Sequence, residues 1–153
     1  MLGQSLALRA SGKGEGVEVR EAMTPVVLTV GPAHTLRAIA RLMSERKVGA
    51  AVVIDPEGSG PGIITERDVL ASVGAEQDPG EELVQAHLTR DVVFAAPEWS
   101  LEEAARAMVR GGFRHLIVLA RGEVVGILSL RDVVRCWTED GALCPVPAGS
   151  AVG

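Results

Sequence analysis

The spacing of apolar positions predicts two helices of the same design. After Thr35 comes an apolar stripe at the spacing of one helix face, formed by Leu36, Ile39, Ala40 and Met43. After Ser100 the same stripe is formed by Leu101, Ala104, Ala105 and Met108. Threonine and serine are favoured caps of helix N-termini, and Glu103 stands where it completes a capping box with Ser100. Both helices are therefore expected to bury one face.

Continuous apolar runs predict buried strands around these helices. Residues 26–30 form a β-branched run before Gly31 and Pro32, and residues 50–54 and 116–119 are wholly apolar. A strand with one solvated face alternates apolar and polar residues, whereas a strand covered on both faces is apolar throughout. We therefore expect sheets that are covered on both sides.

A short glycine motif occurs twice, at residues 62–68 and 126–132. Each copy has a glycine, two aliphatic residues, a hydroxyl residue and, three places later, an aspartate. Apolar residues then resume, so each copy predicts a short buried strand running directly into a helix. Thr65 and Ser129 would be the N-caps, with Asp68 and Asp132 at the third helical position.

The glycine motifs belong to a longer internal repeat. Residues 23–24 correspond to 88–89, and residues 48–54 to 113–119, with an offset of 65 in both cases; at the glycine motif the offset is 64. Two copies are too few for a solenoid and suggest two supersecondary units that share a core. Each unit is predicted to be β-α-β-β-α, which gives an α+β (α/β) fold of two repeats related by an approximate two-fold axis.

Turn-rich and polar stretches divide the chain around these units. We expect a flexible leader over residues 1–16, a first unit over 17–74, a linker over 75–82, a second unit over 83–138 and a mobile tail over 139–153.

Composition narrows the function classes. The 153 residues are 47% hydrophobic with a formal net charge of −5, which suits one compact core and disfavours a phosphate-backbone-binding surface. No apolar run approaches the roughly 18 residues of a membrane span, and residues 1–9 do not read as a signal peptide. The two cysteines, Cys136 and Cys144, are expected to be free thiols, and we expect a cytoplasmic protein.

The repeated motifs resemble the tandem cystathionine-β-synthase (CBS) domain pair, or Bateman module. The resemblance is carried by residues 23–25, 48–55 and 62–68 in the first copy and is repeated at residues 88–89, 113–118 and 126–132. It implies a regulatory binder rather than an enzyme. It also implies adenosine-containing ligands such as AMP, ADP, ATP or S-adenosylmethionine, held in clefts between the units, with no cofactor required. The length of the chain leads us to expect a stand-alone pair.

The resemblance also implies residue roles. The hydroxyl and carboxylate of each glycine motif would meet the ribose, which assigns Thr65 and Asp68 to one site and Ser129 and Asp132 to the other. One base pocket would be lined by Thr24, Val26, Ala50 and Ala51. The other would be lined by Thr89, Val92, His115 and Leu116. The phosphate-binding candidates are Arg67, Arg114, His115 and Arg131. An extra carboxylate at Glu66 would weaken a triphosphate site.

Other interpretations stay open at this stage. A hydroxyl residue followed three places later by an acid is also an ordinary capping box, which stabilises a helix without any ligand. The protein could be an interaction scaffold with empty clefts, or a nucleic-acid or metal binder, although charge and ligand-type residues disfavour the last two. Motifs of nucleophilic or P-loop catalysis are absent from the sequence.

The apolar helix stripes also predict assembly. Two-fold symmetry is the commonest way to cover a shared apolar surface, and the resembled family associates through its helices. We therefore expect a homodimer formed by the helices that begin at Thr35 and Ser100 and by those after the glycine motifs. An unidentified regulated protein would be a further partner.

Overall fold

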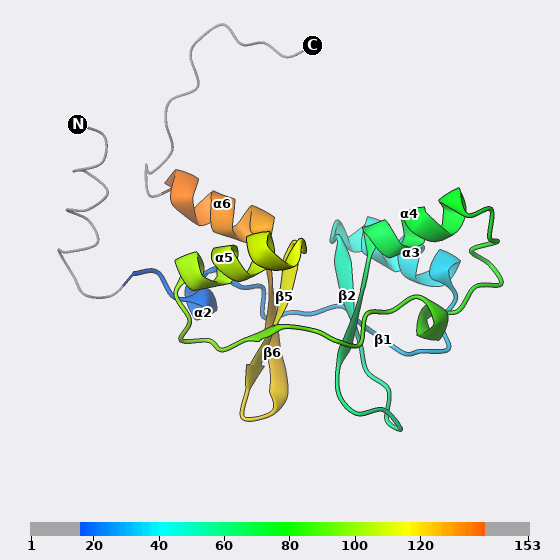
Figure 1. The fold of residues 1–153 in the computed structure, drawn as a ribbon, viewed down its shortest axis with the longest axis horizontal. Coiled ribbons are helices and arrows are strands. Elements are labelled where there is room, and N and C mark those ends of the chain that lie inside the picture. The colour runs from blue at the N-terminus through cyan, green and yellow to red at the C-terminus, as the bar shows by residue number, and fades with distance from the viewer. Residues whose placement is uncertain (1–15, 140–153) are drawn as a thin grey trace, which may run out of the picture.

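The computed structural model describes residues 16–139 of the chain. Nearly all of the predicted leader and tail, with Cys144, lies outside these residues. The described chain forms two similar halves that stand side by side (Figure 1). The longer helices of both halves lie toward one side of the molecule, and the strand hairpins turn at the opposite side (Figure 1).

The first half has the predicted β-α-β-β-α order. It consists of β1 (Thr29–Val30), α3 (Leu36–Arg46), β2 (Ala50–Val53), β3 (Gly62–Thr65) and α4 (Glu66–Gly74). Its sheet has the order β1-β2-β3, in which β1 runs parallel and β3 antiparallel to β2. Thr35 caps α3 as predicted, since its Oγ1 accepts a hydrogen bond from the Ala38 amide at 3.2 Å.

The second half repeats this order and topology. It consists of β4 (Phe94–Ala95), α5 (Leu101–Gly111), β5 (His115–Ala120), β6 (Glu123–Ser129) and α6 (Leu130–Glu139). Its sheet has the order β4-β5-β6. The predicted capping box of α5 is present, because the Ser100 amide donates to Glu103 Oε2 at 2.8 Å and Ser100 Oγ accepts from the Glu103 amide at 3.1 Å.

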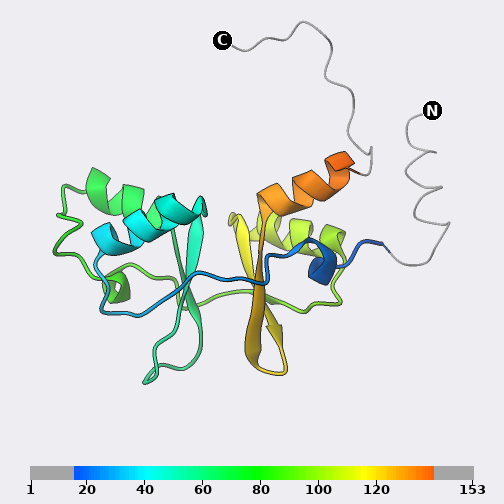
Figure 2. The ribbon, with the colours of Figure 1, turned by 180° about the vertical axis from the view of Figure 1, so that it is seen from behind.

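Each sheet is covered on both faces, which explains the continuous apolar strands. Along β2, Ala51 and Val53 face the helices of their own half, whereas Ala50 and Val52 face the opposing sheet. The second half does the same with Leu116 and Val118 on one face and Ile117 on the other. The result is a helix–sheet–sheet–helix arrangement with one core in each half and a third core between the sheets (Figures 1 and 2).

The segments that precede β1 and β4 are exchanged between the halves. The short helix α2 (Val19–Ala22) comes before the first half in sequence but packs into the core of the second half. The 3-10 helix η1 (Val84–Ala86) comes before the second half but places Val84 in the core of the first. Both views show the two connecting segments crossing between the halves (Figures 1 and 2).

The exchange is symmetric in its hydrogen bonds. The Val19 amide donates to the Trp99 carbonyl at 2.8 Å, and the Val84 amide donates to the His34 carbonyl at 2.9 Å. The two bonds are equivalent, because Val84 corresponds to Val19 and Trp99 to His34 at the repeat offset of 65. One bond runs from the first copy to the second, and the other runs back. Neither half therefore has a complete core without the chain segment that leads into the other.

The sequence-based elements are confirmed in type and order, with differences in length. The run at 26–30 forms only a two-residue strand, because Val26 lies 77% exposed outside the sheet. Met43 and Met108 are buried in the cores. In residues 16–139 no helix is long and apolar enough to cross a membrane.

Candidate functional site

The corner between β3 and α4 places a hydroxyl and a carboxylate together at a helix N-terminus. Asp68 Oδ2 accepts hydrogen bonds from the Thr65 amide at 2.7 Å and from Thr65 Oγ1 at 3.0 Å. Within the described chain, Asp68 Oδ1 has no hydrogen-bond partner. The residues thus form a helix cap, and one carboxylate oxygen stays available as an acceptor.

The corner between β6 and α6 has the same arrangement. Asp132 Oδ2 accepts from the Ser129 amide and from Ser129 Oγ, both at 2.8 Å, and the Asp132 amide donates back to Ser129 Oγ at 3.1 Å. Here the second oxygen is also used, because Arg135 Nη2 lies 3.2 Å from Asp132 Oδ1. Both predicted capping boxes are therefore present.

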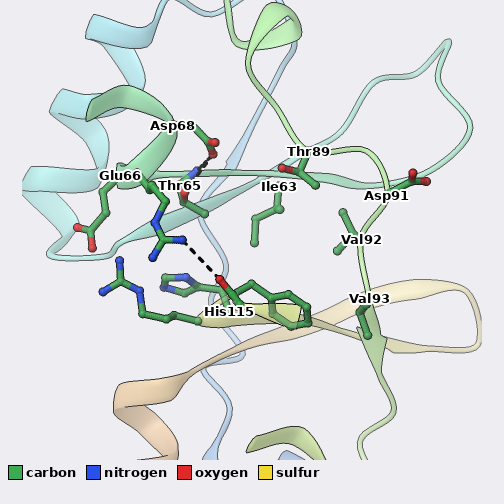
Figure 3. Close-up of a pocket in the computed structure, with 13 residues that line it drawn as sticks. Ile63, Thr65, Glu66, Asp68, Thr89, Asp91, Val92, Val93 and His115 are labelled. Carbon is green, nitrogen blue, oxygen red and sulfur yellow. Dashed lines mark hydrogen bonds between the residues drawn. The ribbon is translucent and has the colours of Figure 1, made fainter. Parts of the chain in front are cut away.

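One pocket lies at the β3–α4 corner (Figure 3). The first half contributes residues 63–68 apart from the core residue Ile64, among them Thr65, Glu66 and Asp68. The second half contributes Thr89, residues 91–93 and residues 112–115. Figure 3 shows Glu66 and Asp91 at opposite edges, with Ile63 and Val92 between them. We call this the Asp68 pocket.

A second pocket lies at the β6–α6 corner, and we call it the Asp132 pocket. The second half contributes Ile127 and much of residues 129–135, including Ser129 and Asp132. The first half contributes Thr24, Val26, Leu28 and several residues around Lys47. With the repeat offsets applied, its lining corresponds position by position to most of the Asp68 pocket. The two pockets are therefore equivalent sites of a pseudo-symmetric pair.

Short two-residue bridges hold the halves together at each pocket. Thr24 and Ile127 exchange backbone hydrogen bonds of 2.9 and 3.0 Å, and Thr89 and Ile63 exchange bonds of 3.0 and 2.8 Å. Each pocket is thereby built from the glycine-motif corner of one half and the entering segment of the other. Sequence positions 65 apart thus end up in different pockets.

Most of the predicted site residues line these two pockets. The Asp68 pocket gathers Thr65, Asp68, Thr89, Val92, His115, Arg67 and Arg114. The Asp132 pocket gathers Ser129, Asp132, Thr24, Val26, Ala50, Arg131, Arg114 and His115.

Two predicted base-pocket residues line neither pocket. Ala51 and Leu116 are fully buried, and their side chains belong to the cores of their own halves. The reason is the period of two along a strand: Ala50 and His115 point to the pocket side, so the next residue points to the helices.

The anion-binding potential of the helix N-termini is smaller than the motif suggests. The Glu66 amide donates to the Gly49 carbonyl at 3.0 Å, and the Leu130 amide donates to the Arg114 carbonyl at 2.8 Å. The cap amides of Thr65 and Ser129 are used by the aspartates. A bound anion would therefore rely on basic side chains.

Three charged or ionisable side chains line both pockets, namely Glu66, Arg114 and His115. Burial lowers the pKa of the His115 imidazole below its usual value; the Glu66 carboxylate raises it, the Arg114 guanidinium lowers it and Asp132 raises it, and burial is the largest of these effects. In the half-to-half correspondence, Leu130, Gly49 and Ala50 stand at these three positions. The three residues thus have uncharged counterparts in the other copy of the repeat.

Sequence reasoning missed three charged residues that line the pockets. Lys47 and Arg135 line the Asp132 pocket, and Asp91 lines the Asp68 pocket. Lys47 and Arg135 lie on helix ends and exposed faces, where a sequence shows only solvated charge. A comparison of the two copies could have identified all three residues, because each has an uncharged counterpart. Lys47 corresponds to Gly112, Arg135 to Ala71 and Asp91 to Val26. In residues 16–139, no three His, Cys, Asp or Glu side chains form a group that could hold a metal ion.

Comparison with known proteins agrees with this architecture. The family model of the CBS domain matches residues 19–75 and 83–139. An uncharacterized protein of Methanocaldococcus jannaschii is 33% identical over 132 residues, which cover 86% of this chain and 47% of that relative.

Solved structures are similar over most of the chain. A hexameric CBS-CP12 protein from bloom-forming cyanobacteria has a TM-score of 0.74 at 27% identity, covering 80% of this chain and 73% of that one. A CBS domain protein from Pyrobaculum aerophilum complexed with AMP has a TM-score of 0.69 at 25% identity, covering 76% of this chain and 89% of that one. The chain described here belongs to the CBS domain family and carries two CBS domains in tandem.

Proposed function

We propose that this protein is a regulatory binder, and not an enzyme, that senses an adenosine-containing nucleotide in its two pockets. The observation that carries the proposal is the repeated corner at which a hydroxyl, a carboxylate and a nearby arginine line a pocket between the halves. The AMP complex of the related Pyrobaculum aerophilum protein supports the ligand class.

The ribose is assigned to the two aspartates. An ionised carboxylate offers only acceptors, which suits the two neighbouring hydroxyl groups of a sugar and repels phosphate. In the Asp68 pocket the open oxygen is Asp68 Oδ1. In the Asp132 pocket the matching oxygen is shared with Arg135 at 3.2 Å, and that contact loosens or reorients when a sugar binds.

The base is assigned to the entering segment of the opposite half, with Thr24, Val26 and Ala50 at one site and Thr89, Val92 and His115 at the other. These residues combine apolar surface with backbone groups beside the short bridges, as a purine requires. Arg131 lies next to the ribose position of the Asp132 pocket and Arg114 lines both pockets, so phosphate in the Asp132 pocket extends toward these side chains. Arg67 lies next to the ribose position of the Asp68 pocket.

The rival function is an interaction scaffold whose pockets bind nothing. It draws on the exposed apolar side chains of the helices, including Leu70, which is 71% exposed, and Val109, which is 78% exposed. The two functions differ in one measurable respect, because only a sensor gains stability from a nucleotide.

Thermal or chemical denaturation with AMP, ADP, ATP and S-adenosylmethionine tests the proposal. A ligand at a hundred times its dissociation constant adds about 2.7 kcal/mol to the free energy of unfolding. Stabilisation by at least one of these compounds is expected. No stabilisation by any of them would favour the scaffold.

The role of the aspartates is tested separately from their role as caps. Asp68→Asn and Asp132→Asn should each weaken binding at one pocket about ten- to a hundredfold, the usual effect of losing a charge-assisted hydrogen bond. Glu103→Gln is the matched control, because Glu103 makes the same cap at α5 and lines neither pocket. If Asp68→Asn and Asp132→Asn, like the control, change the stability of the protein and leave nucleotide affinity unchanged, the aspartates are caps only.

A further inference from the structure

The two pockets are equivalent in backbone but not in charge. Beside the shared Glu66 and Arg114, the Asp132 pocket is lined by the basic residues Lys47, Arg131 and Arg135 and by the carboxylate of Asp132. Beside the same shared pair, the Asp68 pocket is lined by Arg67 and by the carboxylates of Asp68 and Asp91. The Asp132 pocket is thus basic on balance, and the Asp68 pocket is weakly acidic.

We propose that the two pockets divide adenosine ligands by charge: the Asp132 pocket takes the polyphosphate form, and the Asp68 pocket takes a form without phosphate. This inference rests on the proposed function and assigns a ligand class to each site. Charged side chains that line a pocket act on a ligand held in it, because charges are screened only beyond about 8 Å at physiological ionic strength.

The charge difference arises at three corresponding pairs of positions. Lys47 corresponds to Gly112, Arg135 to Ala71, and Val26 to Asp91. Each of the three makes the Asp132 pocket more positive or the Asp68 pocket more negative. Since the shared residues act on both pockets, these three pairs set the preference.

Lys47 has a left-handed backbone conformation, which favours glycine over lysine. It ends α3 in the left-handed region, with φ 55° and ψ 41°, and Gly112 ends α5 in the same region with φ 68° and ψ 24°. A side chain there costs free energy that glycine does not. Helix termination alone would therefore favour glycine at both positions, and the lysine at the mouth of the Asp132 pocket needs a different explanation. Binding of phosphate supplies one.

Arg135 is held toward its pocket by Asp132. Its Nη2 lies 3.2 Å from Asp132 Oδ1, and its side chain is still half exposed. The guanidinium thus neutralises the ribose-binding carboxylate and remains accessible to a phosphate. In the Asp68 pocket, Asp68 has no such partner among residues 16–139, and Arg67 donates to the Gly112 carbonyl at 3.4 Å.

The test titrates the full chain with ATP, with adenosine and with inorganic tripolyphosphate. We expect one ATP per chain, bound more weakly as salt is raised, and adenosine that still binds when ATP is saturating. Asp132→Asn should weaken ATP, and Asp68→Asn should weaken the adenosine that binds beside saturating ATP.

Lys47→Gly is the decisive variant, because glycine is the residue at the corresponding Gly112 and preserves the helix end. It should weaken ATP and tripolyphosphate about tenfold and leave adenosine unchanged. Arg41→Gln is the control for loss of a positive charge, since Arg41 lies exposed on the same helix and lines neither pocket.

Several outcomes would overturn the division by charge. Equal effects of Lys47→Gly on ATP and adenosine would do so, as would ATP binding that depends on Asp68 and not on Asp132. If tripolyphosphate stabilises the wild type through Lys47 but no adenosine compound binds, the proposed nucleotide function fails and the anion preference stands. If none of the three compounds binds, both proposals fail.

Discussion

Gly62 and Leu88 lie so close that a β-carbon built on the glycine would stand 2.3 Å from Leu88 Cδ1. The same β-carbon would stand 3.0 Å from the carbonyl oxygen of Thr89. Gly126 has the same relation to Met23 and Thr24, at 2.6 and 3.1 Å. The glycine that opens each repeated motif is therefore required by the chain that crosses from the other half.

Gly62→Ala should destabilise the protein, because the new methyl group forces Leu88 and the Thr89 backbone to move. Overpacking of this kind typically costs about 1–3 kcal/mol. The measurement is the urea midpoint of unfolding. Gly74→Ala is the control: Gly74 is the last residue of α4, has open space around its Cα and should show no loss. Equal stability of Gly62→Ala and the wild type would show that the crossing segment adapts freely.

Val19→Ala should loosen the second half rather than the first. Val19 is fully buried in the core of the second half, although it precedes the first half in sequence. Loss of most of a buried valine side chain costs up to about 1.5–3 kcal/mol. Hydrogen exchange should therefore rise first in α5, β5 and β6. Val84→Ala is the reciprocal variant and should raise hydrogen exchange first in β2 and α3. If, in either variant, hydrogen exchange rises only in residues near the substitution in sequence, the swapped packing of the entering segments is wrong.

The free energy of unfolding should fall as pH is lowered through about 6.5, the ordinary pKa of histidine. Burial holds the pKa of His115 below that value in the folded state, so the unfolded chain binds the proton first. His115→Ala should reduce this slope, and alanine is suitable because Ala50 occupies the corresponding position. Urea unfolding between pH 7.5 and 5.5 provides the comparison. An unchanged slope in the variant would assign the effect to other groups.

A homodimer is predicted through the helices, and light scattering should give twice the chain mass of 16.0 kDa. Exposed apolar side chains on the helices provide the surface, and they are Leu70, Val73, Val109, Val134 and Trp137. Leu70→Glu should weaken association by placing a charge in the interface. Ile54→Glu, in the loop between β2 and β3, is the control. A wild type of monomer mass at micromolar concentration would refute the dimer.

Much of the fold is encoded in local patterns that one sequence displays. The repeat offset, the apolar stripe after Thr35 and the caps at Ser100 and Ser129 depend on neighbours a few residues away, and the structure has all of them. The apolar runs at β2 and β5 likewise indicated sheets covered on both faces. Local hydrogen bonding and the spacing of buried apolar residues therefore determined the elements, their order and the repetition of one unit twice.

The composition of each pocket was decided only by tertiary structure. Which entering segment joins which corner depends on the exchange of residues 17–24 and 83–89 between the halves. This is a contact between distant residues that no local pattern specifies. The packing of the two halves likewise places Thr89 and Thr65 in one pocket and Lys47 and Asp132 in the other. The direction of Ala51 and Leu116 into the cores was also set there, because the pairing of strands fixes which alternate residues face the pockets.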